Sequence, residues 1–415
     1  MATSFSSRLI DGDQHYYEPA DAFTRHLDQS YRHAIRWADV DGRKKLLVND
    51  RVFKMIPNPT FDPVAKPGAL AAYFQGKNQA GTDTATLVGQ LEPIRPEYRD
   101  REQRVARLND QGVTAAFLLP TLALGIEELL GDDPVAAHAA FRAFNRWIED
   151  DWGFNRDGRI VAPAVMTLLD AEEAERDLAW VIEHGARSIC FRPAPISGPH
   201  GEGSPADPLY DRFWAMAADA EVLVAYHAAD SGYAGQAAAW GERAHFQGYK
   251  DSPFTEILSL HIERPIFDTL AALVAHGLFD RHPRLRVSTV ELGSGWVREL
   301  LRRMAISYGK IPQAFRRDPV ESFREHVWVT PFQEDHLSEL VELIGADHIL
   351  FGSDWPHPEG MAEPRGCPSP TQRHRPRRRR ANRGRKPWPS SPAPMTVPPD
   401  KGRAVTPQLI DGRRS

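Results

Sequence analysis

The chain has 415 residues, of which 41% are hydrophobic and 26% charged, and its formal net charge is −5. This composition is typical of a globular protein, and no apolar run approaches the roughly 18 residues that a membrane-spanning helix needs. The N-terminal residues lack the apolar core of a secretion signal, and the two cysteines, Cys190 and Cys367, cannot build a disulfide framework. We therefore expect a cytoplasmic protein with no membrane partner.

The net charge conceals an asymmetry along the chain. Residues 365–415 hold 14 basic and two acidic side chains, a net of +12, whereas the rest of the chain carries a net of −17. Arginine and proline dominate this segment without a helical apolar period, so it cannot bury enough apolar surface to offset its ordering entropy. We expect one folded unit at residues 1–362 and a disordered basic tail at residues 363–415.

Apolar runs alternate with amphipathic segments through most of the folded unit. The expected strands lie in residues 9–19, 113–120, 159–165, 188–192, 222–227, 285–291, 327–330 and 348–354. The expected helices lie in residues 99–110, 134–152, 170–183, 207–220, 265–276, 294–308 and 334–344. Strict alternation predicts a parallel sheet of the α/β class, and eight repeats suggest a closed (β/α)8 barrel, the TIM barrel.

A long insertion interrupts this rhythm at about residues 20–98. It is rich in proline and glycine, and a short alternating run near residues 45–49 predicts a small hairpin. A loop region of this length inside a compact domain is usually functional, so we expect it to cover an active site. Six of its aromatic residues form either a lid over that site or the insertion's own core: Tyr31, Trp37, Phe53, Phe61, Tyr73 and Phe74.

Polar side chains stand where the expected strands end. Asp13 and His15 are two positions apart on the first strand, so they project to the same side and could form half of a divalent metal site. The later strands end in Arg192, His227, Glu291 and Asp354. Their structural alternatives are half of an ion pair, a hydrogen-bonded core histidine, a helix cap and the start of a turn, respectively. Joint placement at the carboxyl ends of barrel strands, where such barrels carry their active sites, favours a functional site.

Three motifs resemble a known family. Residues 11–19 read Asp-Gly-Asp-Gln-His-Tyr-Tyr-Glu-Pro, residues 290–296 read Val-Glu-Leu-Gly-Ser-Gly-Trp, and residues 349–360 read Ile-Leu-Phe-Gly-Ser-Asp-Trp-Pro-His-Pro-Glu-Gly. They are similar to motifs of the amidohydrolase-related metal-dependent TIM-barrel enzymes. This branch includes aminocarboxymuconate-semialdehyde decarboxylase and similar aromatic-acid decarboxylases. The resemblance runs from about residue 8 to residue 362.

The resemblance implies a metal centre. The family's metal-binding positions fall on Asp13, His15, His227 and Asp354 of this chain. Two-metal members of the wider superfamily use a carboxylated lysine on strand four, where this chain has Arg192. The resemblance therefore implies one divalent ion. Zinc suits such histidine and carboxylate ligands best, and manganese is also compatible with them.

The implied chemistry has two forms. A bound metal lowers the pKa of its water towards about 7, and Asp354 could take that proton. This gives hydrolysis of a small organic substrate, with or without a carboxylate. The alternative is non-oxidative decarboxylation of an aromatic or unsaturated acid, in which an acidic group protonates the carbon. Glu291 stands where many relatives have a histidine, and its role as ligand, base or orienting group stays open. This exchange makes hydrolysis our first prediction.

Two further residues are candidates for catalysis. Arg192 could pair with a substrate carboxylate through two hydrogen bonds. His357, three residues after Asp354, is a proton donor, a support for the site, or simply a loop histidine between two prolines.

The end of the resemblance has its own explanations. After residue 360 the basic tail replaces the family's final helix. A frameshift explains this change better than the alternative, which is a genuine tail that binds nucleic acid through the release of counterions. A frameshifted C-terminus would make the protein an inactive or unstable relative, the second alternative function. We expect a small-molecule substrate and no nucleic-acid partner beyond what the tail could bind. A homodimer is compatible with the sequence.

Overall fold

The computed structural model describes residues 9–198, 201–243, 252–332 and 336–364. The expected tail, residues 363–415, lies outside these ranges except for its first two residues. Its disorder and the domain boundary near residue 362 stay predictions.

The centre of the fold is a ring of parallel strands. These strands are β1 (Leu9–His15), β7 (Val113–Leu119), β8 (Ile160–Val161), β9 (Ala164–Val165), β10 (Ser188–Phe191), β13 (Leu223–His227), β14 (Arg286–Val290) and β15 (Val327–Val329). Hydrogen bonds join them into two parallel sheets, in the orders β1-β7-β8 and β15-β14-β13-β10-β9. The α/β class with a parallel sheet is therefore confirmed.

The third expected strand, residues 159–165, is split. β8 pairs with β7, whereas β9 pairs with β10, so each half contacts a different neighbour. Pro163 lies between the halves and has no N–H to donate, which interrupts the ladder at this point.

The eighth expected strand, residues 348–354, is not a continuous strand. Residues 349–355, which we call the eighth segment, form only two isolated bridges, from Ile349 to Val329 on β15 and from Trp355 to Gln14 on β1. The backbone N–H of Leu350 donates to the Val329 carbonyl at 2.9 Å. On the other side, the segment's backbone bonds to β1, and these contacts close the ring of strands.

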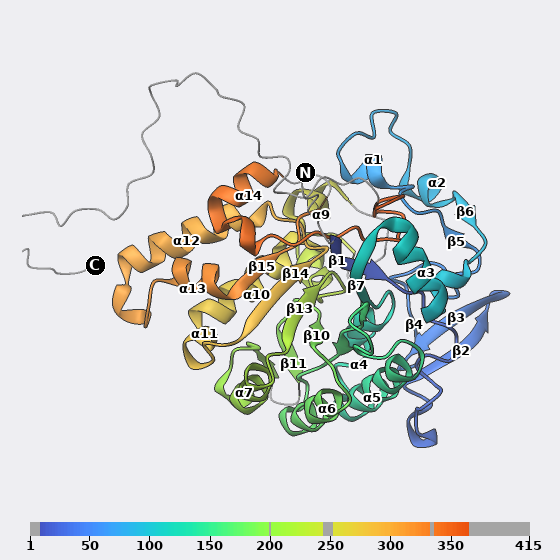
Figure 1. Ribbon diagram of the computed structural model, residues 1–415, viewed down its shortest axis with the longest axis horizontal. Coiled ribbons are helices and arrows are strands. Elements are labelled where there is room, and N and C mark those ends of the chain that lie inside the picture. Colours follow the sequence, from blue (N-terminus) through green and yellow to red (C-terminus); the bar gives the residue numbers. More distant parts are fainter. Residues whose placement is uncertain (1–8, 199–200, 244–251, 333–335, 365–415) are drawn as a thin grey trace, which may run out of the picture. The chain divides into compact units, whose positions relative to one another are not determined.

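The seven expected helices are present, with small shifts at their ends. They are α3 (Arg101–Gln111), α5 (Pro134–Asp151), α6 (Ala171–Glu183), α7 (Asp211–Asp219), α10 (Glu263–Ala275), α12 (Trp296–Lys310) and α14 (Leu337–Ile344). Asp170 caps α6 by accepting a hydrogen bond from the Glu173 N–H, as its position predicts. Figure 1 shows the larger helices outside the strands, which is the layering of a TIM barrel.

Shorter helices connect these elements. The α-helices are α1 (Ala71–Phe74), α2 (Thr84–Val88), α4 (Glu127–Leu130), α8 (Ala234–Ala238), α9 (Pro253–Leu258), α11 (Leu278–Arg281) and α13 (Pro319–His326). The 3-10 helices are η1 (Gln29–Tyr31), η2 (Pro96–Tyr98), η3 (Ala123–Gly125), η4 (Pro208–Tyr210), η5 (Pro312–Ala314) and η6 (Ala346–His348).

The insertion after β1 contains small antiparallel sheets. Its strands are β2 (Ile35–Val40), β3 (Arg43–Val48), β4 (Arg51–Val52), β5 (Val64–Ala65) and β6 (Leu91–Glu92). The β2–β3 pair is the expected hairpin, and β5 pairs with β6. Outside the insertion, β11 (Ile196–Gly198) and β12 (Gly201–Gly203) form another hairpin.

Burial is uneven around the ring. Trp147, Trp214 and Trp355 are fully buried in the core, whereas Ile10 on β1 is 55% exposed. Among the described residues, which end at residue 364, no helix follows the eighth segment, and the expected loss of the family's final helix stays a prediction. Among the same residues, no helix is long and apolar enough to cross a membrane.

Candidate metal centre and substrate pocket

The first half of the candidate site lies on β1. Asp13 and His15 are 1% and 0% exposed, and they alternate with Gln14 on the strand as the sequence predicts. The backbone fixes both, because the Asp13 carbonyl accepts from the Asp354 N–H at 2.7 Å and the His15 N–H donates to the Trp355 carbonyl at 2.8 Å. Closure of the ring thus places the two side chains.

Side chains from three other strand ends converge on His15. Its Nε2 atom lies 3.3 Å from Asp13 Oδ1 and 3.4 Å from Asp354 Oδ1. The same atom is 3.2 Å from Nε2 of His227, which ends β13, and 3.7 Å from Oε2 of Glu291, which follows β14. His227 Nε2 and Glu291 Oε2 are 3.1 Å apart. The structure therefore brings together all four expected ligands and Glu291.

Buried oxygens without hydrogen bonds indicate that a cation fits this cluster. Oδ1 of Asp13 and both carboxylate oxygens of Asp354 are buried and accept no hydrogen bond. Such groups are rare in folded proteins because their desolvation is costly. Two overlapping groups of side chains here have ligand atoms close enough to share one ion, His15 with Glu291, Asp354 and His357, and Asp13 with His15 and His227. Imidazole nitrogens with carboxylate oxygens suit zinc or manganese.

The electrostatics of the cluster favour the same conclusion. Burial raises the pKa of Asp13 and of Asp354 well above the ordinary value, and it lowers the pKa of His15 well below. Burial also lowers the pKa of His227, but the hydrogen bond and charge of Glu291 outweigh it, so the net shift is upward. A divalent cation would stabilise ionised aspartates beside neutral imidazoles.

Two of the carboxylates stand on strained backbone. Glu291 has a φ of +56° and Asp354 a φ of +53°, in the left-handed region that side chains other than glycine rarely adopt. Glu291 follows the end of β14, and Asp354 lies near the end of the eighth segment. At both residues the backbone turns sharply and directs the carboxylate toward His15. Strain of this kind gathers at functional sites.

His357 is positioned by its neighbours. Its Nδ1 lies 2.8 Å from Asp354 Oδ1, its Nε2 lies 3.0 Å from Thr121 Oγ1, and its ring stacks on His15 with centroids 3.8 Å apart. The Thr121 hydroxyl donates its proton to the Tyr16 carbonyl, so it must accept from His357 Nε2–H. Nδ1 therefore faces Asp354, and burial lowers the pKa of His357 to about 4.

Arg192 does not join the cluster, contrary to its expected role. Its buried guanidinium pairs with two consecutive glutamates of α4, Nε with Glu127 at 3.3 Å and Nη1 with Glu128 at 2.6 Å. Nη1 also donates to the Asp230 carbonyl, in the loop after His227. These contacts occupy the group that was expected to bind a substrate carboxylate, so the ion-pair alternative describes Arg192 better.

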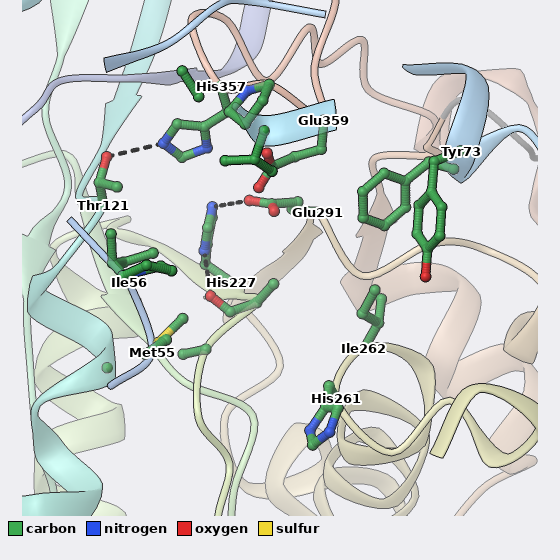
Figure 2. Close-up of a pocket in the computed structure, with 18 of the residues that line it drawn as sticks. Met55, Ile56, Tyr73, Thr121, His227, His261, Ile262, Glu291, His357 and Glu359 are labelled. Carbon is green, nitrogen blue, oxygen red and sulfur yellow. Dashed lines mark hydrogen bonds and ion pairs between the residues drawn. The ribbon is translucent and has the colours of Figure 1, made fainter. Parts of the chain in front are cut away.

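A cavity of about 700 Å³ adjoins the candidate metal-binding cluster, which is formed by Asp13, His15, His227, Glu291 and Asp354. Figure 2 shows His227, Glu291, His357 and Glu359 pointing toward one another on one side of this pocket. The insertion contributes much of the wall, including Phe61, Tyr73 and Phe74 of the expected aromatic lid. Phe53 is buried in the core, and Tyr31 and Trp37 pack partly against it, so the insertion's aromatic residues serve both expected purposes.

Several lining residues were missed in the sequence. Thr121 follows the second strand directly, and Glu359 lies within the motif at residues 349–360, so position alone could have indicated both. His261 and Glu263 lie where α10 begins, after a stretch without a clear period, and nothing in the local sequence marks them.

Comparison with known proteins identifies the family. A family model described as amidohydrolase matches residues 11–372. The chain belongs to the amidohydrolase family. An amidohydrolase from Mycobacterium avium subsp. paratuberculosis K-10 has a similar structure, with 42% identity over 86% of this chain and 92% of that chain and a TM-score of 0.79. The resemblance in the motifs is thus confirmed, and the family is one of metal-dependent enzymes.

Curated relatives of this amidohydrolase carry a more specific name. A gamma-resorcylate decarboxylase of Rhizobium radiobacter is 36% identical over 90 residues, which cover 20% of this chain and only 28% of that protein. The gamma-resorcylate decarboxylase of a Polaromonas species is 24% identical over 279 residues, which cover 63% of this chain and 80% of that protein. The first match therefore spans less than a third of the relative's length.

Proposed function

We propose that this amidohydrolase is a metal-dependent, non-oxidative decarboxylase of an aromatic hydroxy acid. The name of the curated relatives carries this proposal, and it favours the alternative in the sequence prediction over hydrolysis. The site is compatible with it, because a largely apolar pocket of about 700 Å³ adjoins the cluster that could hold the ion. Such pockets suit aromatic ligands.

In this proposal one divalent ion, zinc or manganese, is held by Asp13, His15, His227 and Asp354. When bound, the ion would fix the substrate carboxylate and stabilise negative charge on the neighbouring oxygen. Ser188–Phe191, the fourth barrel strand, ends beside Arg192 and provides no lysine for a second ion. The Ala228 carbonyl, 2.8 Å from His227 Nδ1, would orient that histidine and leave Nε2 for the ion. Glu291 Oε2, 3.1 Å from His227 Nε2, would then face the same ion.

The Asp354–His357 pair is the proposed proton source. Asp354 would be ionised as a ligand, so the proton would be carried by His357 Nδ1, which lies 2.8 Å from Asp354 Oδ1, while Thr121 fixes the other ring nitrogen. The ring carbon of the substrate takes this proton. The bond to the carboxylate then breaks, its electron pair returns to the ring, and carbon dioxide leaves. Solvent restores the proton, so the net reaction consumes one proton for each carbon dioxide.

The test is metal content followed by carbon dioxide release. We expect the full chain to bind about one equivalent of zinc or manganese, as a single His/Asp site would, and to release carbon dioxide from 2,6-dihydroxybenzoate or a related hydroxybenzoate. His227→Ala and Asp354→Asn should lose both properties. His184→Ala, at an exposed histidine outside the site, is the matched control and should keep both. A metal-loaded enzyme that hydrolyses esters or lactones but releases no carbon dioxide from any hydroxybenzoate would refute the proposal in favour of hydrolysis.

A further inference from the structure

Glu291 faces two imidazole nitrogens at the edge of the pocket. Its Oε2 lies 3.1 Å from His227 Nε2, a contact that Figure 2 shows, and 3.7 Å from His15 Nε2. His227 Nδ1 lies 2.8 Å from the Ala228 carbonyl, so the ring proton of neutral His227 belongs on Nδ1. Nε2 then presents a lone pair to an ionised carboxylate, which is an acceptor only. Two acceptors at this distance repel each other unless a proton or a cation lies between them.

A proton alone does not satisfy the cluster around His15. Four atoms lie 3.2–3.7 Å from His15 Nε2, and they are His227 Nε2, Asp13 Oδ1, Asp354 Oδ1 and Glu291 Oε2. A ring N–H points in one direction, so at most one of these contacts is a good hydrogen bond. Asp13 Oδ1 and both carboxylate oxygens of Asp354 are buried without a hydrogen-bond partner. One cation among these atoms would make every contact favourable, those of Glu291 included.

Glu291 changes the donor set that the cluster offers. Without it, two imidazoles and two carboxylates supply four donors, which is the number that zinc prefers. With it, the donors are two nitrogens and three carboxylate oxygens. The ligand atoms of His15, Glu291 and Asp354 are close enough to share one ion. Sets of this kind, with more oxygen and more than four donors, suit manganese.

We propose that Glu291 binds the ion directly as a fifth ligand, and that its carboxylate favours manganese relative to zinc. This inference rests on the proposed function, which places a divalent ion among Asp13, His15, His227 and Asp354. The competing arrangement is an ion pair between protonated His227 and Glu291, in which neither Nε2 nor Oε2 binds the ion. Removal of the Glu291 charge weakens metal binding in the first arrangement and frees His227 for the ion in the second.

Metal affinity of the full chain separates these arrangements. Competition with a chelating dye gives the dissociation constants of manganese and zinc for the unmodified protein and for Glu291→Gln, which keeps the shape of the side chain and removes its charge. Zinc keeps four preferred donors in this variant, whereas manganese loses an oxygen ligand. We expect manganese to bind about 100-fold more weakly and zinc about tenfold more weakly. Equal weakening of both ions, or unchanged or tighter binding, would overturn the inference.

Glu359→Gln is the matched control for charge. Burial is the main cause of the raised pKa of Asp13 and of Asp354, and the charges of Glu291 and Glu359 both add to it. Glu359 is in neither group of described side chains that could share an ion. Its loss should change the ratio of the manganese and zinc constants by less than about twofold. A change equal to that in Glu291→Gln would mean that Glu291 acts through its field alone, against the inference.

Cobalt supplies a second readout that a distant charge would not move. The visible absorption of protein-bound cobalt is weak with five or six donors and several-fold stronger with four. We expect weak absorption from the cobalt-loaded full chain and from Glu359→Gln, and strong absorption from Glu291→Gln. The same spectrum in all three proteins would overturn direct binding by Glu291.

The inference and the proposed function fail in different ways, because metal affinity and the cobalt spectrum need no turnover. If both readouts single out Glu291 but no hydroxybenzoate releases carbon dioxide, the ligand inference holds and the decarboxylase proposal fails. If carbon dioxide is released but Glu291→Gln and Glu359→Gln bind the two ions alike, the decarboxylase proposal holds and the ligand inference fails.

Discussion

Arg192 shows how a single residue can occupy a functional position and serve a structural purpose. It follows β10 at the carboxyl end of the ring, where an arginine could bind a substrate carboxylate. In the structure, its guanidinium instead forms ion pairs with Glu127 and Glu128 and donates a hydrogen bond to the Asp230 carbonyl. By holding the loop that follows His227, Arg192 acts on the site through the backbone.

Arg192→Met is therefore expected to destabilise the fold. Arg192 and Glu127 have side chains that are 4% and 5% exposed, so the variant leaves a buried carboxylate without its cation. Losing one partner of a buried pair costs about 3–5 kcal/mol in the free energy of unfolding, which urea denaturation would measure.

The double variant Arg192→Met, Glu127→Gln is the control for this loss. It removes the buried charge while the amide oxygen can still accept from the Thr167 hydroxyl, so most of the stability should return. A raised KM in Arg192→Met with unchanged stability would instead support direct binding of the substrate.

At the scale of elements, the sequence predicts most of the ring but not its closure. Buried strands between amphipathic helices have strong local patterns, and the positions of the candidate ligands follow from the ends of these strands. The eighth segment forms only two isolated bridges, and a left-handed residue, Asp354, turns the chain near its end. The partners of Arg192 come from the four-residue helix α4, which lies in a stretch without a periodic pattern. Side-chain contacts of that kind depend on the tertiary fold and have no local signal.

Gly352→Ala tests the closure of the ring. A Cβ at this position would lie 2.5 Å from Thr330 Cγ2 and 2.6 Å from the Cβ of Asp13, so the eighth segment or one of these two neighbours must move. Overpacking of this kind costs about 1–3 kcal/mol, and the shift of Asp13 should also weaken metal binding. Thermal unfolding and metal titration measure the two effects.

Gly309→Ala is the matched substitution on α12. Its new Cβ would meet nothing within 4 Å, and alanine in place of glycine in the last turn of α12 should raise the stability by less than about 1 kcal/mol. If both variants behaved alike, close packing between β1, β15 and the eighth segment would not be what closes the ring.

For the whole molecule, acid should weaken the fold through histidines that are buried without charge. His326, 3% exposed, ends α13, stacks on Phe279 with centroids 4.5 Å apart, and donates from Nδ1 to the Leu285 carbonyl. Its Nε2 has no hydrogen-bond partner, and burial lowers the pKa of this histidine below 6.5. The stabilising contribution of neutral His326 is therefore complete above pH 6.5.

That contribution is lost as the pH falls from 6.5 through the lowered pKa, because the unfolded chain binds the proton first. His326→Gln keeps a side-chain amide near the Leu285 carbonyl but cannot titrate. We expect its stability, relative to that of the unmodified protein, to improve steadily between pH 6.5 and pH 5 in urea denaturation. Phe279→Leu disturbs the same packing without removing the histidine, so its deficit should not show this steady recovery. A constant difference between His326→Gln and the unmodified protein across this range would mean that His326 keeps its proton on folding, and the acid sensitivity would then have to come from the metal-binding cluster.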